Sequence, residues 1–156
     1  MSRIRLVENF REFMDLASIN QGPDGWSIYG SNPKSLSHAE NVAFPELGIK
    51  SIKSKIDTGA DGTAIHANSI KEKDGVLSFW VTSPKQVLEF KKFKKVEVKS
   101  SSGTKQTRYQ INTTVEFGDH SFKIKISLAD RGSMKYPCIL GKNFLKAGKF
   151  TVDINQ

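Results

Sequence analysis

The chain has few of the residues on which several classes of site depend. Its single cysteine, Cys138, excludes an intramolecular disulfide, and its apolar neighbours favour a small buried side chain over a nucleophile. The three histidines, His38, His66 and His120, show neither an H-E-x-x-H pattern nor paired Cys/His spacing, so no zinc site is predicted. We expect His66 to satisfy a hydrogen bond, and we expect neither a metal nor another cofactor.

Long apolar segments are also missing. No apolar run approaches the ~20 residues of a membrane span. The N-terminus lacks the short apolar core of a signal peptide. We therefore expect a cytoplasmic protein that makes no contact with a membrane.

Acidic residues are in the minority, and the imbalance is uneven along the chain. Lys and Arg total 24 against 16 Asp and Glu, which gives a formal net charge of +8. Residues 1–40 hold 4 basic and 5 acidic residues, so residues 41–156 carry a net charge of +9. Such a field favours an acidic partner, either nucleic acid or an acidic peptide, although an ordinary basic surface explains it equally well.

One short motif carries a specific chemistry. Asp57-Thr58-Gly59 follows an apolar strand pattern, and the glycine allows a tight turn that leaves the carboxylate at the strand tip. Two carboxylates in contact share a proton, so one serves as base and the other as acid. The 156 residues are too few for two barrels of ~100 residues, and no second D-T-G or D-S-G occurs. A carboxylate pair would therefore need a second chain across a two-fold axis.

Alternating apolar and polar residues predict a chain that is mostly β. The motifs after Pro137 add a short helix that ends near Gly148, with Phe144 and Leu145 on its apolar side. The predicted strands cover residues 42–44, 49–56, 63–65, 69–71, 76–82, 86–99, 109–117, 122–128, 137–140 and 150–154.

The first forty residues have a different character. Residues 4–18 show apolar positions at helical spacing, and residues 26–40 are rich in turn-forming residues. We predict an N-terminal helical extension and linker over 1–40, followed by a barrel domain over 41–156. The helix is expected to pack on the barrel, although it could also cover a sheet edge or bind a partner.

The lysine-rich segment between residues 91 and 99 has two interpretations. Basic pairs flank Phe93, as in an aromatic and cationic patch for nucleic acid. The same lysines could guard an edge strand against aggregation, and we favour this second interpretation. The small residues of 99–106 then predict a mobile hairpin tip.

Three motifs in order resemble the retropepsins, the one-lobed aspartic proteases that work as homodimers. They are the D-T-G-A loop at Asp57, the glycine-containing hairpin at Ser100 to Gly103, and Ile139-Leu140-Gly141 leading into a short helix and a terminal strand. The resemblance implies an all-β closed barrel with one lobe per chain, a short C-terminal helix and, here, an added N-terminal helix.

A narrower resemblance covers about Val42 to Ile154. It is to the bacterial retropepsin-like family once labelled ATP-dependent zinc proteases, on segments that include Phe44-Pro45-Glu46-Leu47-Gly48 and K-I-D-T-G-A. RimB-type members are associated with removal of glutamate residues added to a ribosomal protein, which implies an acidic peptide substrate. This chain departs from that family at Asp61-Gly62, where an Arg-Thr pair would be expected.

The resemblance implies a role for each matching residue. Asp57 would be catalytic, and Thr58, Gly59 and Ala60 would form the active-site loop. The residues expected to contact substrate are Asp61, Ser100, Ser101, Ser102 and Gly103. The expected activity is that of a homodimeric aspartic endopeptidase, with acidic or glutamate-rich peptides as candidate substrates. The alternative is an inactive dimeric barrel that serves as a binding or assembly module, with nucleic acid bound through residues 91–99.

Overall fold

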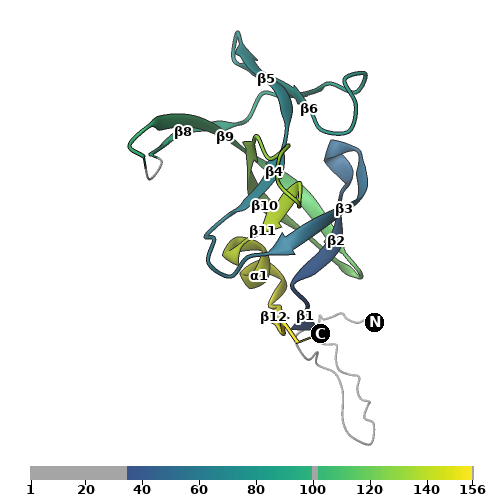
Figure 1. Ribbon diagram of the computed structural model, residues 1–156. Helices are drawn as coiled ribbons and strands as arrows, with labels where there is room; N and C mark the ends of the chain where they lie inside the picture. Colours follow the sequence, from purple (N-terminus) through teal and green to yellow (C-terminus); the bar gives the residue numbers. More distant parts are fainter. Residues whose placement is uncertain (1–34, 100–101, 156) are drawn as a thin grey trace, which may run out of the picture. The chain divides into compact units, whose positions relative to one another are not determined.

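The computed structural model describes residues 35–99 and 102–155. The predicted helix over 4–18, Ser100 and Ser101 lie outside the described residues. The described chain consists mainly of strands, together with one 3-10 turn and one short helix (Figure 1). In chain order these are β1 Ser35–Leu36, β2 Ala39–Phe44, η2 Pro45–Leu47, β3 Ile49–Ile56, β4 Thr63–His66, β5 Asn68–Lys73, β6 Val76–Trp80, β7 Leu88–Phe90, β8 Lys94–Lys99, β9 Lys105–Phe117, β10 His120–Ala129, β11 Cys138–Leu140, α1 Lys142–Gly148 and β12 Thr151–Val152.

Six strands close into a barrel. Their order is β10-β4-β11-β3-β2-β9, and pairing of β9 with β10 completes the ring. Alternation drives the closure, since one side of each long strand is apolar; along β10, for example, Ile124, Ile126 and Leu128 are buried while Lys123 and Lys125 are exposed. The predicted all-β closed barrel with a short C-terminal helix is confirmed.

The C-terminal helix is fixed by an aromatic cluster. Phe144 of α1 is fully buried, and its ring stacks on Phe150 with centroids 5.0 Å apart. Phe117 and Phe122 of the β9–β10 hairpin pack against both rings. Burial of several aromatic rings contributes strongly to stability, so this cluster anchors α1 on the barrel. Neither α1 nor any other described helix is long and apolar enough to cross a membrane.

Two of the predicted strands are longer than the strands in the structure. The predicted strand over 86–99 is two strands, because β7 pairs with β6 in a three-stranded sheet whereas β8 pairs with β9 of the barrel sheet. The predicted strand over 150–154 is reduced to Thr151–Val152, since Phe150 turns inward to the aromatic cluster. β12 pairs in parallel with β1, which lies ahead of the predicted domain start at residue 41.

The lysine-rich strand lies at a sheet edge. β8 is the last strand in the sheet order and pairs only with β9 among the described strands. Its register runs from Lys94 opposite Gln110 to Lys99 opposite Lys105, so the connection predicted as a hairpin tip joins β8 to β9. The predicted edge position of this segment is confirmed among the described strands, whereas protection against aggregation by its lysines stays a prediction.

Candidate active site

Asp57 follows the strand β3, which lies between β2 and β11 in the barrel. β11 runs parallel to β3, with Leu140 opposite Ile56, and the Asp57 N–H donates to the Leu140 carbonyl at 3.0 Å. Figure 1 shows β3, β11 and β4 side by side, with α1 next to the connection from β3 to β4. The carboxylate is therefore placed by a strand that is paired on both sides.

A tight turn presents the carboxylate. The Ala60 N–H donates to the Asp57 carbonyl at 3.3 Å, and the Gly59 N–H donates to Asp57 Oδ1 at 3.0 Å. A Cβ on Gly59 would lie 3.4 Å from that same oxygen, so glycine leaves room for the approach. Asp57 is half-buried, whereas Thr58 and Gly59 are exposed. The turn thus orients the carboxylate without removing it from solvent.

The start of α1 holds the rest of this turn, residues 57–62, which we call the Asp57 loop. The Lys142 N–H donates to the Ala60 carbonyl at 2.8 Å, and the Asn143 N–H donates to the Asp61 carbonyl at 3.1 Å. A Cβ on Gly141 would lie only 2.1 Å from the Gly62 oxygen. Glycine is therefore required at 141, because the two backbones touch there.

A buried polar link supports the loop from below. Thr63 Oγ1 donates to Asn143 Oδ1 at 2.8 Å and accepts from the Gly141 N–H at 3.3 Å. Asn143 Nδ2 donates to the Lys125 carbonyl of β10 at 2.8 Å. Sequence analysis did not single out Thr63 or Asn143. The available signal was a polar residue directly before an apolar pair, with Thr63 before Ala64-Ile65 and Asn143 before Phe144-Leu145.

The remaining predicted site residues that the structure describes belong to two segments of the chain. Asp61 is exposed and forms an ion pair with Lys142, with Oδ1 3.5 Å from Nζ. Ala60 is half-buried within the Asp57 loop. Ser102 and Gly103 are exposed in the turn between β8 and β9, which is a different hairpin from the Asp57 loop. The structure therefore joins Asp57, Thr58, Gly59, Ala60 and Asp61 in one loop, whereas Ser102 and Gly103 belong to the β8–β9 hairpin.

Lys55 shares the outward side of β3 with Asp57. Ser54 and Ile56 are buried and face the interior, so Lys53, Lys55 and then Asp57 alternate on the other side. Ile139 lies directly opposite Lys55 in the register and is half-buried. No described carboxylate forms an ion pair with Lys55. A cation is thus two residues away from the carboxylate, on the same side of the strand.

Both ring nitrogens of His66 form hydrogen bonds. Its Nδ1 accepts from the Arg131 N–H at 2.8 Å, which places the ring proton of the neutral form on Nε2, and Nε2 donates to Asn68 Oδ1 at 3.1 Å. The predicted hydrogen-bonding role of His66 is confirmed. Within the residues that the structure describes, no group of three His, Cys, Asp or Glu side chains could hold a metal ion.

Cys138 is fully buried, as predicted, and lies opposite Ser54 of β3. Burial raises the pKa of its thiol to about 11. The thiol is therefore protonated at neutral pH and is not a nucleophile.

Comparisons with known proteins agree on the barrel. Residues 36–156 match the RimB-like family model, described as retropepsin-like aspartic endopeptidase RimB. A solved Legionella pneumophila protein of unknown function superposes with a TM-score of 0.62 at 25% identity, covering 80% of this chain and 96% of that one.

Curated relatives carry a different description. A protein of Shewanella halifaxensis is 33% identical over 127 residues, and one of Desulfotalea psychrophila is 31% identical over 121 residues; each is named probable alpha-L-glutamate ligase. The matches cover 75% and 70% of this chain, yet only 28% and 26% of those relatives. The family match spans most of the chain and includes the Asp57 loop, so this chain belongs to the RimB-like family of retropepsin-like aspartic endopeptidases.

Proposed function

We propose that the chain is an aspartic endopeptidase that hydrolyses peptide bonds as a homodimer with one Asp57 from each chain. The observation that carries the proposal is that backbone hydrogen bonds hold the Asp57 loop in place. Its carboxylate is oriented by the Gly59 N–H, while α1 fixes the carbonyls of Ala60 and Asp61. A carboxylate held by a rigid scaffold and still open to solvent suits acid–base catalysis.

The proposed dimer follows from the single D-T-G motif. The exposed Thr58 and Gly59 are available to meet the same loop of a second chain across a two-fold axis. Two Asp57 carboxylates in contact would share one proton. The ionised carboxylate would take a proton from a water, and the protonated one would polarise the scissile carbonyl, so no covalent intermediate is needed.

Acidic peptides are the proposed substrates. Lys55 lies on the side of β3 that bears Asp57 and has no described carboxylate partner, so it could pair with an acidic side chain next to the scissile bond. The net charge of +9 on residues 41–156 supports the same substrate class. The glutamate ligase names of the curated relatives also point to glutamate-containing chains, although this chain matches only 28% of the length of such a relative. Asp61, Ser102 and Gly103 remain candidates for contacts with the peptide backbone.

The test is cleavage of a peptide library enriched in glutamate over pH 4–8, with the wild-type chain and the Asp57→Asn variant. Solution mass establishes the dimer in both proteins. We expect the variant to keep the dimer and to lose cleavage by at least about 10²-fold to 10⁴-fold. If a verified wild-type dimer cleaves no peptide, the endopeptidase proposal fails and the barrel is better explained as a binding module.

A further inference from the structure

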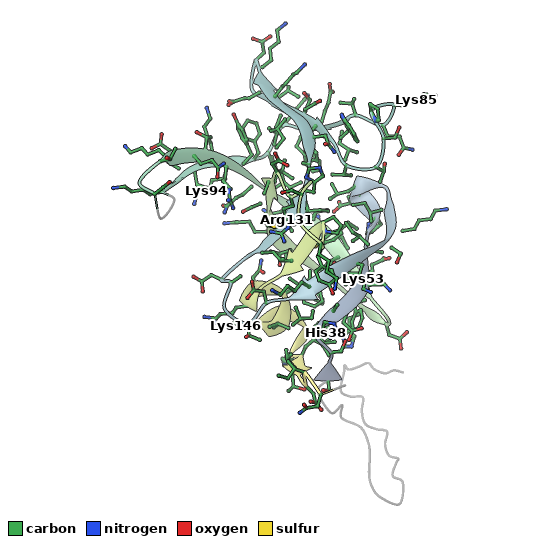
Figure 2. All side chains as sticks on the ribbon, in the orientation of Figure 1. His38, Lys53, Lys85, Lys94, Arg131 and Lys146 are labelled. Carbon is green, nitrogen blue, oxygen red and sulfur yellow. The ribbon has the colours of Figure 1, made fainter. Side chains whose placement is uncertain are left out.

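A second basic site lies on the outer face of the barrel, across β8, β9 and β10. A cleft of about 300 Å³ there is lined by Lys92, Lys94 and Lys125 together with the amides of Gln110 and Asn112. We call it the lysine cleft. Phe93 and Ile111 complete its lining, which contains no acidic residue. Lys94 is labelled on β8 in Figure 2.

Strand register explains why these side chains converge. Lys94 lies opposite Gln110, and Lys125 lies opposite Asn112, in two antiparallel pairings that share β9. Residues 110 and 112 are two apart on β9, so their side chains point to the same face of the sheet. The intervening Ile111 is buried and faces the barrel interior. Three lysines from two strands and a connecting turn thereby meet over a pair of amides.

The lysines of the cleft differ from their neighbour Lys95. Lys95 points to the opposite face, where its Nζ pairs with Glu72 Oε1 at 3.0 Å. Of the carboxylates in residues 35–99 and 102–155, none forms an ion pair with Lys92, Lys94 or Lys125. Three like charges in one concave site with amide donors beside them are arranged for an anionic ligand.

We infer that the lysine cleft binds the carboxylates of an acidic peptide segment, outside the residues that flank Asp57. An acidic peptide fits better than nucleic acid, because binding of single-stranded nucleic acid relies on aromatic rings on which bases stack. The only aromatic residue of the cleft, Phe93, packs against the ring of Tyr109 at 5.9 Å. Asn112 and Gln110 instead carry amide N–H groups, which donate to carboxylates; one amide hydrogen of Gln110 already points to Ser127 Oγ, 3.3 Å from Nε2, and its second hydrogen remains for a ligand.

The cleft is connected to the Asp57 loop. Lys125 contributes its side chain to the cleft and its backbone carbonyl to Asn143, whose N–H in turn holds the Asp61 carbonyl. A peptide anchored at the cleft would therefore be held close to the active-site loop, which raises its effective concentration there. That the anchored peptide is a substrate rests on the proposed function; carboxylate binding by the cleft does not.

The test measures binding without cleavage. A fluorescent hexaglutamate peptide is titrated with the full chain carrying Asp57→Asn, and fluorescence anisotropy gives the Kd at low salt. In that background the triple variant Lys92→Gln, Lys94→Gln, Lys125→Gln is expected to raise the Kd by at least about fivefold. The matched control removes three exposed lysines elsewhere, Lys71→Gln, Lys85→Gln and Lys146→Gln, two of them labelled in Figure 2, and should raise the Kd by less than about twofold.

Each outcome decides the inference. It is overturned if hexaglutamate does not bind, if both triple variants weaken binding equally, or if a six-nucleotide single-stranded DNA binds more tightly and depends on the same lysines. The single variant Lys125→Gln repeats the measurement in case the triple variant fails to fold. If hexaglutamate binding depends on the cleft while the wild-type chain cleaves no peptide, the cleft stands and the endopeptidase proposal falls.

Discussion

The Asp57 loop and the lysine cleft differ in how firmly their polar groups are held. In the loop, backbone groups are fixed by partners from β11 and α1, and glycine is required where the two backbones touch. In the cleft, three long side chains make no ion pair with a described carboxylate. Proton transfer requires fixed geometry, whereas charge attraction tolerates motion. Changes to the loop should therefore affect stability and activity, and changes to exposed charges should affect mainly binding.

The largest expected effect comes from Gly141→Ala. Its Cβ would lie 2.1 Å from the Gly62 oxygen and 2.7 Å from the Ala60 oxygen, so the loop or α1 must move. We expect a loss of about 3 kcal/mol in the free energy of unfolding, measured with urea. The control is Gly62→Ala, where a Cβ would meet nothing within 4 Å. Equal losses of unfolding free energy in the two variants would show that contact with α1 does not hold the Asp57 loop in place.

Asn143→Ala should have the next largest effect. The change removes the acceptor of the Thr63 hydroxyl and the donor to the Lys125 carbonyl. Because Thr63 is buried, we expect a loss of about 2 kcal/mol in the free energy of unfolding. Asn41→Ala, an exposed position on β2, is the control. A loss no greater than that of the control would mean that the buried polar link contributes little.

Lys55→Gln tests whether charge beside Asp57 selects the substrate. With peptides that differ only by Glu or Gln next to the scissile bond, we expect the kcat/KM preference for Glu to fall about tenfold. Lys53→Gln is the matched control, since Lys53, labelled in Figure 2, is an exposed lysine two residues before Lys55 on β3 and four before Asp57. If the wild-type enzyme cleaves both peptides and Lys55→Gln leaves their ratio unchanged, Lys55 does not determine specificity.

The smallest expected effect concerns Glu46, an exposed carboxylate that does have partners. The Thr114 N–H, which donates to its Oε1 at 2.7 Å, lowers the pKa of Glu46 below 4.5. A lowered pKa in the folded state adds stability above the unfolded value, and this stability is lost as the pH falls through the folded pKa.

Glu46→Gln should therefore reduce the free energy of unfolding at pH 7 by less than about 1 kcal/mol, because solvent screens the charge. The difference from wild type should be smaller at pH 3 than at pH 7, because Glu46 becomes protonated as the pH falls. Urea titrations of both proteins at the two pH values measure it. A difference that persists unchanged at pH 3 would assign the effect to packing and not to charge.

Much of the barrel could be predicted from local patterns. Alternation located most strands, and the glycines of the D-T-G and I-L-G motifs marked the turns that follow β3 and β11. The break between β7 and β8 was not predicted, because continuous alternation does not show that consecutive residues pair with different strands. The hydrogen bond between Thr63 and Asn143 was also not predicted, since the two residues are 80 positions apart in the sequence.

The sequence by itself determined a mostly β chain with a single D-T-G motif, a basic body and a buried cysteine. These features depend on residue type and on spacing over a few positions. Tertiary structure alone decided which groups hold the Asp57 loop, that Lys55 is opposite Ile139, and that Lys92, Lys94 and Lys125 meet in one cleft. The physical reason is strand register, which sets side chains from distant segments opposite one another.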